Sequence, residues 1–110
     1  MPQVRFRQSI AANATEDINL APNDRFGPAG GKVELFCVTI ADGDHRATLM
    51  VGTDVILDRG FPNVPLAPGV VDLQRDKMAE GFGAPFDPIT LRIENTTVGA
   101  VVCSGLVNIT

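Results

Sequence analysis

Apolar residues recur at every second position along much of this chain, and this spacing restricts what it can fold into. In residues 89–94, Ile, Leu and Ile alternate with Thr, Arg and Glu, and residues 101–109 continue the pattern. Successive side chains of a β-strand point to opposite faces of its sheet, so a period of two places one apolar face against a core. Segments rich in proline and glycine separate the alternating stretches. The sequence therefore predicts an all-β protein.

The first third of the chain predicts a half-buried strand, a short second strand and a central strand. Residues 4–10 alternate apolar and polar side chains, which indicates a half-buried strand, and residues 17–20 fit a short second strand. A loop dense in Pro and Gly covers residues 21–31. Residues 32–41 are apolar on both faces, which is typical of a strand in the middle of a sheet.

The middle of the chain predicts a meander followed by a crossing. Turns at residues 42–44 and 52–53 separate residues 32–41, 46–51 and 53–57, so we expect these three strands to be neighbours in one sheet. Residues 59–69 hold three prolines and two glycines, which excludes a central strand and favours a connection from one sheet to another.

The stretch after this crossing is ambiguous. Val70, Leu73, Lys77 and Met78 are spaced as one or two helical turns, but Val71 and Leu73 also fit a short strand. We favour the strand, followed by a polar loop over residues 81–88.

The end of the chain predicts a hairpin. Residues 89–94 and 101–109 are expected to pair across a turn at residues 95–99. Val102 and Leu106 lie on the second face of the last strand, so either a loop covers them or they are offered to another subunit. Because the alternation runs to the last residues, we expect no tail or linker to a further domain.

Together these signals predict a single antiparallel β-sandwich over residues 1–110. A chain of 110 residues forms one domain with its own core. Seven or eight strands with turns about every 8–12 residues are typical of a sandwich. Strand order does not follow from the pattern, so jelly-roll and immunoglobulin-like topologies both stay open.

Composition argues against several kinds of partner. The formal net charge of −4 repels phosphate backbones, so we expect no direct nucleic-acid binding. We interpret Arg5 and Arg7 as a solvated strand face. The chain has neither Trp nor Tyr, which disfavours stacking sites for sugars. No apolar run reaches the roughly 18 residues of a membrane helix, and no signal peptide precedes the first strand, so we expect synthesis in a cytoplasm.

No catalytic motif is present, and we expect no enzyme activity, no cofactor and no metal. Asp42, Asp44 and His45 together suggest a metal, calcium or acid–base site, but a polar hairpin tip explains them better. Four further acids are interpreted as surface residues: Asp54, Asp58, Asp72 and Asp76.

The two cysteines, Cys37 and Cys103, each lie in the middle of an apolar strand. A disulfide across the sandwich is compatible with the pattern. We favour two buried free thiols, because synthesis in a reducing compartment keeps cysteines reduced.

Apolar side chains in the loops are the candidate functional residues. Such residues either cap the ends of the sandwich core or form docking surface for neighbouring subunits. Six of them are candidate interface residues: Phe26, Phe61, Val64, Leu66, Phe82 and Phe86. We expect the centre of an interface to include Phe61, Val64 and Leu66.

The order of these features resembles a known family. An opening strand MPQVRFRQSI, a middle MVGTDVILDRG and an end LRIENTTVGAVVCSGLVNI are similar to small single-domain virion proteins of bacteriophages, especially tailless or marine phages. In those proteins a pattern R-x-x-N-T-T-x-G-A marks the last hairpin. Here it is formed by Arg92, Asn95, Thr96, Thr97, Gly99 and Ala100.

The resemblance implies a jelly-roll-like or immunoglobulin-like sandwich in a particle shell. The protein would be a minor capsid, vertex or decoration subunit of the virion, made in the host cytoplasm. Its partners would be copies of itself and other capsid proteins. No functional residues carry over, since the shared pattern is structural. The alternative hypothesis is a spike-tip module that binds a glycan or receptor through its end loops.

Overall fold

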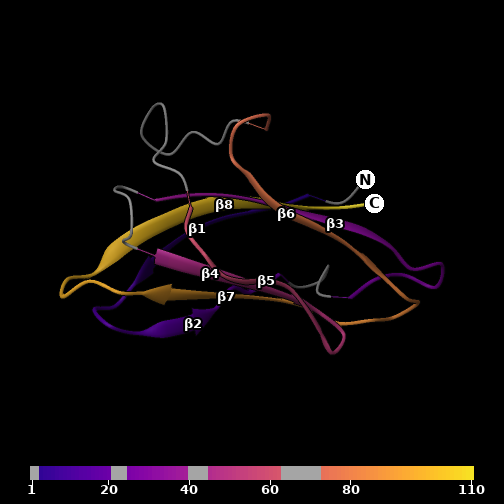
Figure 1. Cartoon of the computed structure of the whole chain (residues 1–110), viewed down its shortest axis with the longest axis horizontal. Coiled ribbons are helices and arrows are strands. Elements are labelled where there is room, and N and C mark those ends of the chain that lie inside the picture. Colours follow the sequence, from indigo (N-terminus) through magenta and orange to yellow (C-terminus); the bar gives the residue numbers. More distant parts are fainter. Residues whose placement is uncertain (1–2, 21–24, 40–44, 63–72) are drawn as a thin grey trace.

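The computed structural model of the chain is a sandwich of two antiparallel four-stranded sheets (Figure 1). It describes residues 3–20, 25–39, 45–62 and 73–110. The strands of this described part are β1 Gln3–Ile10, β2 Thr15–Asp17, β3 Gly31–Thr39, β4 His45–Val51, β5 Asp54–Gly60, β6 Lys77–Gly83, β7 Ile89–Asn95 and β8 Val101–Ile109. The first sheet has the order β1-β8-β3-β6 and the second β2-β7-β4-β5. The predicted all-β sandwich is therefore confirmed.

The strands pair in a nested order. β1 pairs with β8, β2 with β7, β3 with β6 and β4 with β5, and every pair is antiparallel. Of all consecutive strands, only β4 and β5 share a sheet. An immunoglobulin-type sandwich keeps several consecutive strands in one sheet, whereas a jelly roll distributes eight strands over two sheets through Greek-key connections. The strand order is that of a jelly roll, one of the two topologies that the sequence left open.

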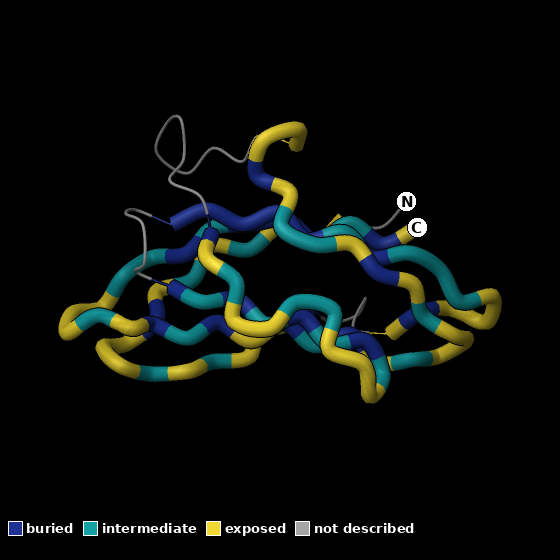
Figure 2. The backbone as a smooth tube through the Cα atoms, in the orientation of Figure 1, coloured by how far each residue is buried: buried dark blue, intermediate teal, exposed yellow. Residues whose placement is uncertain are grey.

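Inward-facing apolar positions of both sheets form the core between them. β4 and β7 alternate buried and less buried residues along their whole length, as predicted for residues 46–51 and 89–94. Ala47, Leu49, Leu91 and Ile93 are fully buried. In Figure 2 the buried segments run along the strands of both layers, and exposed segments gather in the connections at the two ends. Full burial of these side chains contributes about 1.5–3 kcal/mol for each large aliphatic residue.

β3 and β8 are the two central strands of the first sheet and are buried on both faces. The prediction that residues 32–41 form a central strand is confirmed by β3. On the outer face, Phe36 of β3 lies opposite Leu106 of β8, and Leu106 has no exposed surface. Leu106 is therefore covered within this one chain, whereas Val102 keeps an intermediate exposure.

Two predicted pairings are wrong. Residues 32–57 do not form a meander, because β3 lies in the first sheet and β4 and β5 lie in the second. Residues 89–94 and 101–109 do not form a hairpin either, because β7 pairs with β2 and β4, while β8 pairs with β1 and β3. Alternation reveals which face of a strand is apolar but carries no information about which strand lies beside it.

The side chain of Asn95 holds the connection that crosses between sheets after β7. Its Nδ2 donates to the carbonyl oxygens of Ile10, Ala11 and Gly99 at 2.9, 3.2 and 2.9 Å, and its Oδ1 accepts from the backbone N–H of Thr97 at 2.9 Å. Asn95 is only 1% exposed. One buried amide thus satisfies backbone groups of two connections at the same end of the sandwich.

Several strand boundaries also differ from the prediction. β5 is Asp54–Gly60 instead of residues 53–57, so it includes the first two residues of the predicted crossing. The short second strand is Thr15–Asp17 instead of residues 17–20. The strand expected at Val71 and Leu73, with a loop over residues 81–88, is wrong as well: residues 73–75 form a turn and the strand is β6, Lys77–Gly83. Residues 70–72 lie outside the described residues.

β6 was missed because its sequence, KMAEGFG, is poor in residues that favour strands. Its glycines are explained by packing: a Cβ at Gly81 would lie 2.9 Å from Ile56, and a Cβ at Gly83 would overlap the ring of Phe26. The predicted crossing between sheets is confirmed, since β5 and β6 belong to different sheets. Most of the crossing and the turn at residues 42–44 lie outside the described residues.

A matched pair of glycine substitutions tests the packing around β8. A Cβ at Gly105 would lie 2.5 Å from the carbonyl oxygen of Phe36 and would overlap the ring of Phe6, whereas a Cβ at Gly99 meets nothing within 4 Å. We expect Gly105→Ala to lower the free energy of unfolding by about 1–3 kcal/mol, since a packed core resists added volume. Gly99→Ala should change it by less than about 0.5 kcal/mol. Chemical denaturation of both variants measures this, and equal effects would contradict the assigned packing.

Candidate functional site

The predicted interface residues do not form one patch. Phe61, Phe82 and Phe86 are exposed by 55%, 73% and 61%, but Phe26 is only 2% exposed. Val64 and Leu66 lie outside the described residues. Phe26 caps the core, which is one of the two roles considered for these phenylalanines. The other three phenylalanines lie on the exposed surface.

Phe26 is buried because the loop that carries it folds against the end of β6. Its backbone N–H donates to the carbonyl oxygen of Asp87 at 3.0 Å, and its ring occupies the space that a side chain at Gly83 would need. Phe26 belongs to the main hydrophobic cluster. It is therefore not available as an exposed anchor, which corrects its place among the candidate interface residues.

Phe82 and Phe86 lie at one end of the sandwich. Phe82 stands on the edge strand β6 opposite Lys32, and Phe86 is in the turn between β6 and β7. The turn is held by Asp87, whose carboxylate accepts from the backbone N–H of Ala84 at 2.9 Å. Phe86 has a positive φ of 62° and its N–H donates to the carbonyl oxygen of Gly27 at 3.2 Å. This end thus presents Phe82 on the edge strand β6 and Phe86 on the braced turn that follows it.

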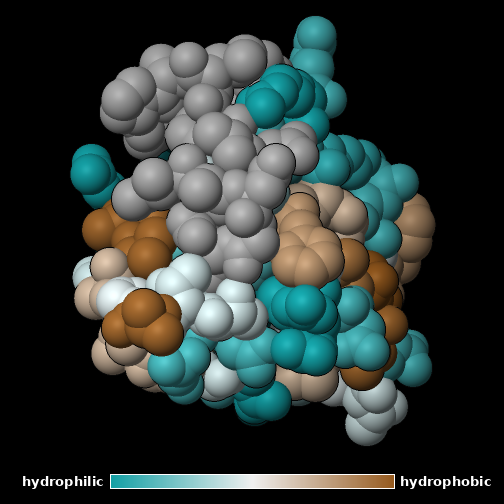
Figure 3. Space-filling view, turned by 60° about the vertical axis from the view of Figure 1, so that its left-hand side comes forward, coloured by the Kyte–Doolittle hydropathy of each residue, from teal (hydrophilic) through white to brown (hydrophobic). Residues whose placement is uncertain are grey.

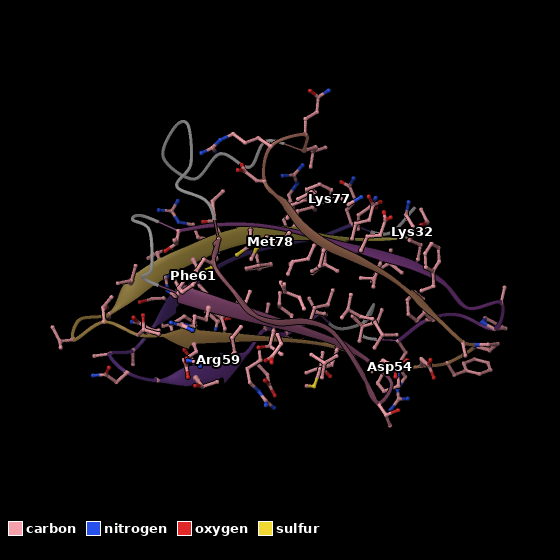
Figure 4. All side chains as sticks on the ribbon, in the orientation of Figure 1. Lys32, Asp54, Arg59, Phe61, Lys77 and Met78 are labelled. Atoms are coloured by element: carbon pink, nitrogen blue, oxygen red, sulfur yellow. The ribbon has the colours of Figure 1, made fainter. Side chains whose placement is uncertain are left out.

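Phe61 lies at the opposite end. It follows Gly60, which pairs with Ala47 near the start of β4. The guanidinium of Arg46 lies over its ring, 4.4 Å from the centroid, so one face of Phe61 is occupied by a cation–π contact. Figure 4 shows Phe61 in the left half of the molecule and Lys32, the register partner of Phe82, in the right half. On the face brought forward in Figure 3, hydrophobic side chains are scattered among hydrophilic ones.

A polar groove crosses the outer face of the second sheet. Its volume is about 230 Å³, and it draws on all four strands of that sheet. The lining residues are Thr15, Arg46, Thr48, Asp58, Arg59, Arg92 and Glu94. Those of β4 and β7 occupy the outward positions of the alternation that buries Ala47 and Ile93 on the other face. Three arginines and two acidic residues line the groove, so its lining carries a net positive charge.

Ion pairs organise most of the groove. Arg59 Nη2 lies 2.6 Å from Glu94 Oε1, and Arg92 Nε lies 3.0 Å from Asp17 Oδ1 beside the groove. Arg59 has a positive φ of 51° in the irregular edge strand β5, and Thr48 Oγ1 accepts its backbone N–H at 3.2 Å. A residue held in this backbone region marks a site that the surrounding structure constrains.

Arg46 differs from the other two arginines of the groove. Its Nε is buried and has no hydrogen-bond partner among the described residues. Arg46 stacks on Phe61, and with Arg59 and Arg92 it gives the groove three cationic side chains, which suit an acidic ligand such as a carboxylate. Sequence analysis missed the groove, although the outward positions of Arg46 and Arg92 were already visible as a signal in the alternation.

His45 is not at a polar hairpin tip, which corrects the prediction. It is the first residue of β4, is fully buried and hydrogen-bonds through Nδ1 with the hydroxyl of Thr39. Extending the inward alternation of Ala47, Leu49 and Val51 back by two residues would have placed it inside. Asp42 and Asp44 lie outside the described residues.

Asp76 is a second correction. It was interpreted as a surface acid but has no exposed surface, and its carboxylate pairs with Arg75 at 2.9 Å. Its backbone carbonyl accepts the N–H of Cys37 at 3.3 Å, at the point where the register of β3 and β6 shifts. Asp54 and Asp58 are exposed as predicted, and Asp72 lies outside the described residues.

A second charged cluster lies on the outer face of the first sheet. Lys77 Nζ lies 2.7 Å from Glu80 Oε2 and 3.0 Å from Glu34 Oε2, and Lys32 lies 3.4 Å from Glu80. Hydrogen bonding to Lys77 is the main reason why the pKa values of Glu34 and Glu80 lie below the usual carboxyl value, and their carboxylates in turn raise the pKa of Lys77. The four charges satisfy one another.

The described residues form neither a metal-binding cluster nor a membrane-spanning helix. Within residues 3–20, 25–39, 45–62 and 73–110, no group of three or more His, Cys, Asp or Glu side chains is placed to hold a metal ion. In the same part of the chain, no helix has the length and apolar character needed to span a membrane. Arg5 and Arg7 are exposed on β1, as expected for a solvated strand face.

No family model matches the sequence, and no curated protein matches it.

The charged cluster around Lys77 predicts how the stability of the protein changes at acidic pH. Because the folded pKa values of Glu34 and Glu80 are lowered, the stability they contribute is present above about pH 4 and is lost as the pH falls through the folded values. We expect Lys77→Met to move both carboxyl midpoints upward, toward ordinary values, and to make the loss of stability on acidification shallower. NMR titration of the carboxyl carbons measures the midpoints.

Lys32→Met is the matched control, because Lys32 is the weaker contributor at Glu34 and lies farther from Glu80. It should shift the same midpoints less. Unchanged midpoints in Lys77→Met would contradict the assigned contacts.

Proposed function

We propose that this protein is a non-enzymatic structural subunit of a phage particle, where it serves as a minor capsid, vertex or decoration protein. It is made in the host cytoplasm and assembles into the virion through contacts with copies of itself and with other capsid proteins, without binding nucleic acid. The observation that carries the proposal is the pair of exposed phenylalanines, Phe82 and Phe86, at one end of the sandwich.

The backbone at this end supports a binding role for the pair. A non-glycine residue with positive φ costs roughly 1–3 kcal/mol unless neighbouring contacts hold it. Phe86 adopts this conformation and still exposes most of its ring. Exposed aromatic side chains on a braced surface are typical anchors of protein interfaces, because burying them against a partner removes a large apolar area from water.

The position of Phe82 supports a second copy of the chain as the partner. β6 is an edge strand of the first sheet, so one side of it has no neighbouring strand within that sheet. Closed symmetric assemblies use the same patch repeatedly. The fold agrees by analogy, since jelly rolls are frequent among viral capsid domains, and the sequence resembles phage virion proteins.

Light scattering across a range of concentrations tests the proposal. We expect the wild-type protein to form a closed oligomer and Phe82→Asp to weaken its association by at least about tenfold, since loss of a central anchor costs 2 kcal/mol or more. The matched control is Phe61→Asp, at the opposite end, which should associate like the wild type. Circular dichroism confirms that both variants fold.

Two other outcomes would contradict this assignment of the interface. If Phe61→Asp blocks association and Phe82→Asp does not, the interface lies at the end that the sequence analysis favoured. A wild-type protein that stays monomeric at every concentration contradicts assembly through copies of this chain.

A second candidate function rests on the polar groove. We propose, as the alternative, a module that binds a glycan or receptor, and Arg46 favours a ligand that carries a carboxylate, such as a sialylated or uronic-acid glycan. The site would rely on charge-assisted hydrogen bonds, since the chain has neither Trp nor Tyr for stacking. Jelly rolls also occur among lectins.

An array of acidic glycans tests this alternative. For a glycan that binds, we expect Arg46→Ala to weaken binding about tenfold or more, because a charge-assisted hydrogen bond contributes about 1.5–3 kcal/mol. Arg7→Ala removes the same charge from the other sheet and should leave binding unchanged. NMR titration measures both affinities, and an array without binding would count against this function.

A further inference from the structure

The two cysteines lie side by side inside the sandwich. Cys37 of β3 and Cys103 of β8 are both fully buried free thiols, as the sequence analysis favoured, and their Sγ atoms are 3.1 Å apart. They belong to the same sheet, so they do not bridge the two layers. The register pairs Thr39 with Cys103 and Cys37 with Gly105, which makes the cysteines diagonal neighbours on the inner face.

We infer that Cys37 and Cys103 form a disulfide when the protein meets a small-molecule oxidant, and that this bond locks β3 to β8. Bonded sulfurs lie about 2.05 Å apart, so the two Sγ atoms must approach each other by about 1 Å for the bond to form. The two cysteines thus form a site of oxidative modification, and we expect the pairing of β3 with β8 to persist after the bond forms.

The chemistry balances with glutathione disulfide as the oxidant. One cysteine thiolate attacks glutathione disulfide, forms a mixed disulfide and releases one glutathione. The second cysteine attacks the protein sulfur of that mixed disulfide and releases the second glutathione. Two protons and two electrons leave the protein, and one glutathione disulfide is reduced to two glutathione thiols.

The buried position makes this reaction slow in the folded protein. The hydrogen bond with Cys103 and the loss of hydration both raise the pKa of Cys37 above its ordinary value, so its thiolate is rare at neutral pH. An external disulfide also has no path to sulfurs without exposed surface. Oxidation therefore requires opening of the sheet, and it is fastest before β8 takes its place between β1 and β3.

The bond would restrain the two strands that hold the first sheet together. It closes a loop across a sequence separation of 66 residues. A loop of this size strongly limits the unfolded chain, and the expected rise in Tm is on the order of 10 °C. In a particle subunit made in a reducing cytoplasm, a setting that rests on the proposed function, release from the cell would favour the disulfide, and the bond would form slowly, in molecules whose first sheet opens.

The test uses the isolated full-length protein, so its result does not depend on assembly. The protein is unfolded in guanidinium chloride with glutathione disulfide and refolded, which removes the barrier of access. We expect mass spectrometry to show the loss of two hydrogen atoms, peptide mapping to link Cys37 to Cys103 within one chain, and Tm to rise relative to the reduced form. Addition of dithiothreitol should restore both thiols and the lower Tm.

Cys103→Ala is the control and should show neither the mass change nor the shift in Tm. The inference is overturned if the refolded wild-type protein keeps both thiols, if the disulfide links two chains, or if its formation lowers Tm. Oxidation of the folded protein without denaturant should proceed at least about tenfold more slowly than during refolding, and equal rates would contradict the role of burial.

Discussion

The nested antiparallel pairing of the strands is the constraint on which the rest of this structure depends. The innermost pair, β4 and β5, closes through Gly52 and Thr53, and Gly52 has the positive φ of 60° that a two-residue loop requires. Each further pair adds one strand on either side of this turn, until β1 meets β8. The chain is in effect one long hairpin, and rolling it up brings β3 beside β8 and β4 beside β7.

This arrangement explains where function can reside. The inner faces of both sheets are filled by the core, so the available surfaces are the two ends, the outer faces and the edge strands. One end carries Phe82 on the edge strand β6 and Phe86 on the braced turn after it. At the other end, Asn95 ties two connections together, and a buried polar group formed by Thr39 and His45 lies beneath. The outer face of the second sheet carries the arginine groove.

The candidate sites could be predicted only in part. Sequence composition selected Phe26, Phe82 and Phe86 alike as candidates, but it could not tell the buried Phe26 from the exposed pair, because burial of an aromatic side chain depends on what folds against it. For Phe26 that neighbour is Gly83, distant in sequence. The groove gathers Thr15, Arg59 and Arg92 from three strands, and their proximity follows from strand order. Strand order is a long-range property that alternation does not encode.

The sequence by itself determined the fold class, most of the strands and the inward faces of β4, β7 and β8, because side-chain period and turn residues are local properties. It also identified β3 as a central strand, since both of its faces are apolar. Only the tertiary structure decided the jelly-roll order, the burial of His45 and Asp76, and the contact between Cys37 and Cys103. These features depend on which strands become neighbours, and the free energy of that choice lies in packing and hydrogen bonds between residues far apart in the chain.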